Sequence, residues 1–173
     1  MSSQELTRKA PKLDANSDQS KLVEIFTGLG MNPTLLHDSL LTPKWIDIGF
    51  QGEDPTTDFR GTGELGLINF HYFVTHREKQ ANECLRHARD KSSEYFLACS
   101  GINVTHHMLK RFLQPEISLN FAGAGNEEEV LSIFNGMYTS FLVKLDQFWV
   151  SSPLSTSFMN FNTVIVSLID RIL

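Results

Sequence analysis

The chain has 173 residues, of which 41% are hydrophobic and 20% are charged, and its formal net charge is −5. This length is enough for one domain with its own hydrophobic core, and the composition is that of an ordinary globular protein. Non-specific nucleic-acid binding needs a basic surface that displaces counterions from phosphates, so the acidic charge argues against it.

The cysteines and the chain ends bear on the cellular compartment. Cys84 and Cys99 form neither a metal-binding pair nor a secreted disulfide framework, which indicates a reducing compartment. The polar start, Met1 to Gln4, has no apolar run typical of a signal peptide. The most apolar tail, residues 164–169, is too short to span a bilayer. The sequence predicts a cytoplasmic protein that reaches endomembranes only through a partner.

The first third of the chain predicts a tail and three short helices. Residues 1–18 are polar and aperiodic, which is typical of a flexible tail, and residues 19–173 are predicted to form a single domain. A helix is predicted to end at Gly30, and the pairs Asn32-Pro33 and Thr42-Pro43 each predict a helix start. The side chains predicted to be buried in these helices are Leu22, Ile25, Phe26, Leu29, Leu35, Leu36, Leu40, Trp45 and Ile48.

The remaining elements are also predicted to be helical. A strongly apolar segment at residues 65–74 predicts a central helix, and a polar one at 78–91 predicts an outer helix. Residues 95–113 predict a long helix in which Gly101 marks either a close crossing or a break, with Pro115 at its end. Residues 122–125 are predicted to be a connector, and Asn126 is predicted to cap the next helix.

The helix after Asn126 carries the clearest apolar stripe, which ends before Pro153, and a last helix is predicted over residues 158–172. No segment alternates with period two, so the predicted fold is all-α, a compact bundle of about six to eight helices with an ordered Gly/Pro-rich loop. The stripe comprises Val130, Phe134, Met137, Tyr138, Phe141, Leu142, Leu145, Phe148 and Trp149.

That loop, residues 45–63, combines a Trp, two Phe, four Gly, a Pro and four acidic residues around a single arginine, Arg60. Gly and Pro interrupt both the helical and the strand period, and Pro55 biases Asp54 away from the helical region. Because both flanks are predicted helices, we expect an ordered loop held by a helical scaffold.

Motifs for chemistry carried out by the chain alone are not present in the sequence. The six histidines show no HExxH pattern, and neither cysteine lies in a nucleophile signature. Residues 61–66 match GxGxxG, but they follow a loop rather than a strand, and no GxxxxGK[ST] motif occurs. The sequence therefore predicts neither a metal site nor a nucleotide site.

Arg60 has two interpretations. Its planar, permanently charged guanidinium is suited to reach into the phosphate site of a partner. Alternatively, it pairs locally with Asp58 or Asp54 and braces the loop, which composition alone favours because acid-paired surface arginines are common.

The pattern of fixed positions around Arg60 resembles the signature of the ELMO domain. A second patch, residues 101–105, resembles the later Gly-Ile-Asn-x-Thr element of that family, and the aromatic helix ending at Phe148 and Trp149 also fits. The resemblance covers about residues 20–173. The positions that carry it in the loop are Trp45, Gly49, Phe50, Gln51, Pro55, Asp58, Phe59, Arg60 and Gly61, followed by residues 63–69.

The resemblance implies a function. Members of the ELMOD type act as GTPase-activating proteins for Arf and Arf-like GTPases, and the arginine of their Asp-Phe-Arg-Gly element is the proposed catalytic group. The larger ELMO scaffolds, which partner Dock-type exchange factors, lack that arginine. This sequence keeps it as Arg60, so it resembles the ELMOD branch, although it is short for that branch. GTP and Mg would be bound by the partner GTPase, with no cofactor held by the chain itself. The alternative is a non-catalytic module that binds a GTPase or an exchange factor.

The resemblance also suggests roles in partner binding or loop positioning. We expect the aromatic residues to anchor the loop, Gly49, Gly61 and Gly63 to permit its turns, and Asp58 to orient Arg60 or to cap the following helix. Gln51 is expected to brace the loop rather than to position water. Phe70-His71 departs from the smaller aliphatic pair expected there. The full set is Trp45, Gly49, Phe50, Gln51, Asp54, Pro55, Asp58, Phe59 and Gly61.

Overall fold

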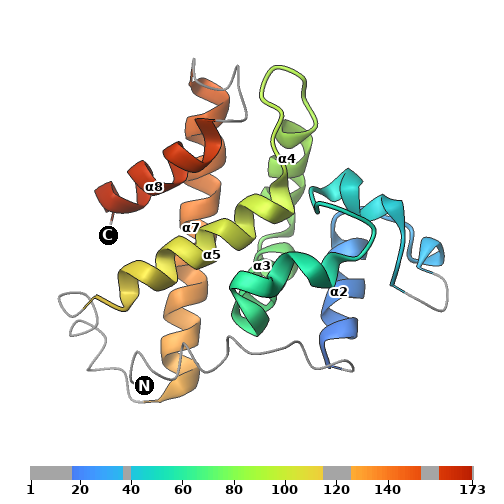
Figure 1. Ribbon diagram of the computed structural model, residues 1–173, viewed down its shortest axis with the longest axis horizontal. Coiled ribbons are helices and arrows are strands. Elements are labelled where there is room, and N and C mark those ends of the chain that lie inside the picture. The colour runs from blue at the N-terminus through green and yellow to red at the C-terminus, as the bar shows by residue number, and fades with distance from the viewer. Residues whose placement is uncertain (1–16, 37–39, 115–125, 153–159, 173) are drawn as a thin grey trace.

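The computed structural model describes residues 17–36, 40–114, 126–152 and 160–172. Throughout these ranges the regular elements are helices, which confirms the predicted all-α class (Figure 1). Elements labelled η are 3₁₀ helices. In chain order they are α2 (Ser17–Gly28), η1 (Pro33–Leu35), η2 (Pro43–Ile48), η3 (Pro55–Gly61), α3 (Gly63–His76), α4 (Glu78–Ala88), α5 (Leu97–Phe112), α7 (Glu127–Ser151) and α8 (Phe161–Ile172).

Helix α3 lies at the centre of the bundle, as its apolar sequence predicted. It contacts α2, α4, α5 and α7, and η3 packs against its first turn. Leu65, Leu67 and Phe70 on different sides of α3 are fully buried, so the helix needs apolar partners all round. Arg60, the candidate functional residue, lies three residues before the start of this helix.

Helices α5 and α7 cross each other beside α3, and α8 packs on both of them (Figure 1). Helix α5 runs without interruption through Gly101, which is buried; a Cβ atom there would lie 2.6 Å from the Tyr138 hydroxyl and 2.9 Å from the Phe70 ring. Of the two predictions for Gly101, the close crossing is the correct one. The large Phe70, where a smaller aliphatic residue was expected, packs against this glycine.

The predicted helix starts are confirmed, but two of them open very short elements. The Asn32 carboxamide oxygen accepts a hydrogen bond from Thr34 N at 3.0 Å, and Asn126 caps α7 by accepting one from Glu129 N at 2.9 Å. Gly30 has the predicted left-handed backbone, with φ of 77°. Helix α4 also has the predicted position and start.

Two predicted core positions are wrong. Leu35 is 38% exposed, because η1 is a single turn of three residues whose side chains cannot all face the core. Phe148 is 41% exposed, because its neighbour Trp149, about 100° further round α7, takes the buried position. The predictions for residues 1–16 and 122–125, and for Pro115, Pro153 and Phe158, lie outside the described residues.

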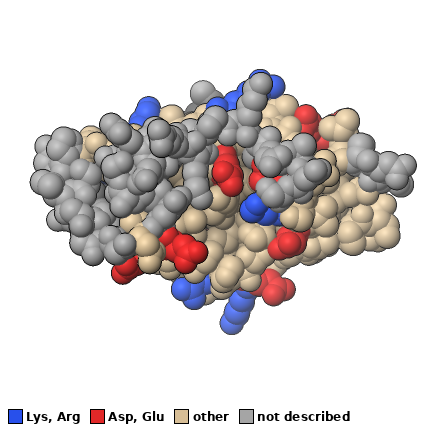
Figure 2. All heavy atoms as spheres, turned by 90° about the horizontal axis from the view of Figure 1, so that it is seen from below, with Lys and Arg blue, Asp and Glu red and all other residues tan. Residues whose placement is uncertain are grey.

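None of the described helices is both long and apolar enough to cross a lipid bilayer. On the face of the molecule shown in Figure 2, basic side chains lie interspersed with acidic ones.

Candidate functional site

The arginine loop, which we define as residues 42–62, is more regular than the sequence predicted. It consists of η2 and η3 joined by residues 49–54. The Thr42-Pro43 pair predicted the helix start of η2, whereas the 3₁₀ helix η3 was not predicted. Each 3₁₀ helix has proline at its first turn after a polar capping residue, Thr42 or Asp54. Thr42 N donates to Glu53 O at 3.1 Å and ties the start of the loop to its middle.

Aromatic side chains fix the loop to the bundle. Trp45, Phe50 and Phe59 are at most 1% exposed. The ring centroids of Phe26 and Trp45 lie 4.8 Å apart, those of Trp45 and Phe50 5.1 Å, and those of Phe50 and Phe59 6.0 Å. Tilted and edge-on contacts of this kind favour defined ring orientations, so the residue after Phe59, which is Arg60, starts from a fixed backbone position. The predicted anchoring by these rings agrees with their burial.

Gly49 joins the loop to the first turn of α5. Its φ of 92° lies in the left-handed region, and a Cβ atom there would overlap Leu97 N and lie 2.8 Å from Ala98 N. Its carbonyl accepts a hydrogen bond from Cys99 N at 3.0 Å. Phe96, the capping residue of α5, makes no side-chain capping bond, so a loop carbonyl partners one of the free N–H groups of this helix start.

Asp58 does not have the contacts that were predicted for it. Its Oδ2 accepts hydrogen bonds from Gln51 N at 2.8 Å and from the Cys99 thiol at 3.6 Å. Thr62, at the start of α3, has no side-chain capping bond, and the Asp58 carboxylate bonds neither to this helix start nor to the Arg60 guanidinium. Asp58 therefore does not cap α3 and does not orient Arg60 directly. Burial, together with the Asp58 carboxylate, raises the pKa of Cys99 to about 12, which keeps the thiol protonated and able to donate. Asp58 thus joins the two halves of the loop to α5.

The second acid of the loop shapes η3. Asp54 Oδ1 accepts from Thr56 N at 3.0 Å and from the Thr56 hydroxyl at 2.6 Å, while Pro55 is buried. Asp54 has the extended backbone expected before Pro55, with φ of −108° and ψ of 100°, and its side chain caps η3. The exposed Gln51 contributes its backbone N–H to the bond with Asp58, in line with a bracing role.

Arg60 is exposed at the end of η3, and its guanidinium makes no hydrogen bond or ion pair with any described residue. The predicted local pairing with Asp58 or Asp54 is therefore not found, because both carboxylates bond to groups within the loop and α5. Gly61 is exposed, with open space where a Cβ atom would lie, whereas the turn into α3 uses Gly63, with φ of 56°. The site is thus a guanidinium that has no partner in the described part of the chain, held on an anchored loop and suited to an anionic group of a partner protein.

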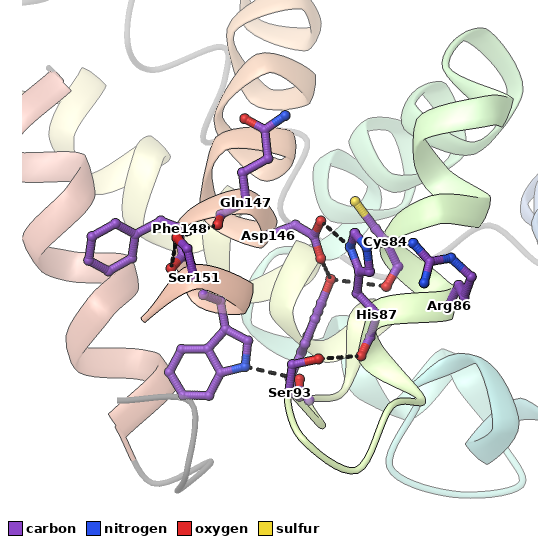
Figure 3. A network of polar contacts seen from close by, with 10 residues as sticks. Cys84, Arg86, His87, Ser93, Asp146, Gln147, Phe148 and Ser151 are labelled. Atoms are coloured by element: carbon purple, nitrogen blue, oxygen red, sulfur yellow. Dashed lines mark hydrogen bonds and ion pairs between the residues drawn. The ribbon is translucent and has the colours of Figure 1, made fainter. Parts of the chain in front are cut away.

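A second polar cluster, which sequence reasoning missed, joins α4 to α7 (Figure 3). Asp146 on α7 is 4% exposed; one carboxylate oxygen lies 2.7 Å from His87 Nδ1 and the other accepts from the Tyr95 hydroxyl at 2.8 Å. The Trp149 indole donates to Ser93 O at 3.0 Å. These partners are 51 to 59 residues apart in the sequence, so no local pattern shows them.

The cluster has no free nucleophile for hydrolysis. The Ser93 hydroxyl donates to the His87 carbonyl at 2.9 Å rather than facing the imidazole, and the Arg86 guanidinium lies 2.7 Å from His87 Nε2. Burial raises the pKa of the Cys84 thiol far above its usual range. Across the described ranges no group of three or more His, Cys, Asp and Glu side chains is arranged to hold a metal ion. The cluster instead fixes α4 and the residues before α5 on α7.

Asp146→Ala is expected to lower the free energy of unfolding by about 3 kcal/mol, because it leaves the His87 and Tyr95 groups without their buried acceptor. Urea denaturation measures this change, with Asp170→Ala on the exposed side of α8 as the control of unchanged stability. A loss below about 1 kcal/mol for Asp146→Ala would contradict the structural role.

Comparison with known proteins places this site in a family. Residues 4–165 match the model of the ELMO/CED-12 family. The chain is 36% identical to ELMO domain-containing protein B of Dictyostelium discoideum over 76% of the chain and 45% of that protein. It is 32% identical to mouse ELMO domain-containing protein 2 over 91% of the chain and 53% of that protein.

A third relative is bovine ELMO domain-containing protein 1, which is 28% identical over 93% of the chain and 54% of its own length. The chain thus spans about half the length of the curated relatives that it matches. No solved structure matches it significantly. The family match covers most of the sequence, including the whole arginine loop, and the chain belongs to the ELMO/CED-12 family.

Proposed function

We propose that this chain is a GTPase-activating protein for small GTPases of the Arf and Arf-like class, and that it supplies Arg60 in trans as an arginine finger. The observation that carries the proposal is the state of Arg60: exposed, without a charge partner among the described residues, and carried by a backbone fixed by buried rings. Its membership of the ELMO/CED-12 family supports the same function.

The physical basis is electrostatic. During GTP hydrolysis negative charge develops on the transferred phosphoryl group and the leaving oxygen, and a preorganised cation there stabilises the transition state. An arginine finger contributes about 10³–10⁵-fold in rate in GTPases. Arg60 has no ion pair with a described residue to break before it enters a partner site, so docking costs it mainly hydration and rotamer freedom. GTP and Mg²⁺ stay with the partner, and the chain needs no cofactor for this role.

A second candidate function is a non-catalytic module that holds a GTPase or an exchange factor. Exposed apolar side chains favour a binding surface here. Ile46 in the loop is 45% exposed and Phe96 at the start of α5 is 42% exposed, and both line a groove of about 470 Å³ together with Gly49. Such a surface serves binding whether or not Arg60 acts in catalysis. In both cases we propose that the protein works in the cytoplasm and meets endomembranes through its GTPase.

A panel of Arf and Arf-like GTPases separates the two functions. Single-turnover GTP hydrolysis is measured with and without the wild-type chain, and binding to each GTPase is measured in parallel. Faster hydrolysis by at least one GTPase is the expected result and identifies the substrate. Binding without stimulation across the panel would overturn the catalytic proposal and support the non-catalytic module.

A further inference from the structure

Three buried polar side chains meet where α3, α5 and α7 cross. Asn69 on α3 donates from Nδ2 to Asn135 Oδ1 on α7 at 2.7 Å, and Thr105 on α5 donates to Asn69 Oδ1 at 3.1 Å. Asn69 and Thr105 are 0% exposed and Asn135 is 5% exposed. The Thr105 hydroxyl also lies 3.4 Å from Gly101 O on its own helix, so it keeps a partner if the helices shift. The Asn69 carboxamide has both of its bonds to other helices, and a shift of α3 would therefore leave a buried amide unpaired.

Close packing around this polar cluster leaves little freedom to move. Gly101 lies one turn before Thr105 on α5, and there is no room for a side chain between it, Phe70 and Tyr138. Phe70 directly follows Asn69. At this crossing α3 is therefore held by the hydrogen bonds of Asn69 and by the ring contacts of the next residue, Phe70.

Two sets of contacts connect α3 to Phe59, which directly precedes Arg60 in the chain. The Phe70 ring packs edge-on against Phe50 at 6.2 Å, and Phe50 packs against Phe59 at 6.0 Å. One turn before Phe70, a Cβ atom on Gly66 would overlap the Thr62 side chain and lie 3.3 Å from the Phe59 ring. Any displacement of α3 thus moves Phe59, and Arg60 is its neighbour in the chain.

We infer that Asn69, Thr105 and Asn135 form a positioning cluster for Arg60. They fix the position of α3 along its axis, and its rotation about that axis, relative to α5 and α7, and thereby the position of the Arg60 guanidinium. The inference rests on the proposed function of Arg60. A finger that stabilises a transition state must be held to within about 0.5 Å, and side chains far from the chemistry supply that placement. It also gives a physical role to Gly101 and Thr105 of the Gly-Ile-Asn-x-Thr element.

The test compares Thr105→Val, which removes the hydroxyl and keeps the shape, with Thr105→Ser, which keeps the hydroxyl and removes a methyl group. Ile165→Val on α8, fully buried and off the route to Arg60, is the control for a similar loss of core packing. For the Arf-class GTPase stimulated most by wild type, Thr105→Val is expected to lower kcat about 10-fold with KM within about 2-fold. Thr105→Ser and Ile165→Val are expected to keep the wild-type kcat.

Hydrogen–deuterium exchange of residues 59–66 tests the same inference without any GTPase. Thr105→Val is expected to speed exchange of these amides, and Thr105→Ser and Ile165→Val are not. An unchanged exchange rate in Thr105→Val, or a kcat equal to wild type, would overturn the positioning role. If the wild-type chain stimulates no GTPase but Thr105→Val still speeds exchange, the proposal of Arg60 as an arginine finger is overturned. The coupling of this cluster to the loop then still holds.

Discussion

Replacing Arg60 with alanine is expected to reduce stimulated GTP hydrolysis by about 10³–10⁵-fold, which corresponds to roughly 4–7 kcal/mol of transition-state stabilisation. Arg60→Lys is expected to recover only a small part of this rate, because an ammonium does not donate in the fork that a guanidinium offers to phosphate oxygens. Single-turnover hydrolysis at saturating activator measures both losses.

The fold should not depend on this side chain. The Arg60 side chain is exposed and makes no bond with the described residues, so Arg60→Ala is expected to change the free energy of unfolding by less than about 0.5 kcal/mol. Arg77→Ala, at the exposed opposite end of α3, is the matched control and is expected to keep full activity. A marked loss of thermal stability in Arg60→Ala would instead indicate that this arginine braces the loop.

Gly49→Ala is expected to destabilise the protein by about 3 kcal/mol or more, or to prevent folding. A left-handed backbone costs a non-glycine residue about 1–2 kcal/mol, and here the added Cβ also meets backbone atoms at the start of α5, which cannot rotate away as a side chain can. The loop and α5 would have to separate, and the bond from Cys99 N to Gly49 O would be lost.

Gly61→Ala is the control for this substitution. Gly61 has open space where a Cβ atom would lie and no positive φ. Gly61→Ala is therefore expected to change the free energy of unfolding of the protein by less than about 1 kcal/mol. Urea denaturation of the two variants measures the difference. Equal stability of Gly49→Ala and wild type would show that Gly49 does not hold the loop against α5.

Much of the fold can be predicted from the sequence because its signals are local. Asn32-Pro33, Thr42-Pro43 and Asn126 each combine a capping side chain with a helix start, and all three are used. The uninterrupted apolar surface of α3 likewise indicates the central position. Single exposed side chains such as Leu35 and Phe148 are harder to predict, since which face is buried depends on the neighbouring helices.

The site could be predicted in part. The spacing around Arg60 predicts the loop and its buried rings. The partner of Asp58 could not be predicted, because Cys99 lies 41 residues further along the chain and its approach depends on how α5 packs against η3. The same holds for Asn69 and Asn135, which are 66 residues apart and meet only in the folded bundle.

The most direct test of the role of Arg60 compares two states of the GTPase partner. Affinity of the chain is measured for the GTPase loaded with GDP and aluminium fluoride, which mimics the transition state, and for the GTPase loaded with a non-hydrolysable GTP analogue. We predict that wild type binds the first form about 100-fold or more tightly than the second, and that Arg60→Ala loses this preference while keeping its affinity for the second. Equal affinity of wild type for both forms, or a preference that survives in Arg60→Ala, would contradict the role of Arg60 in trans.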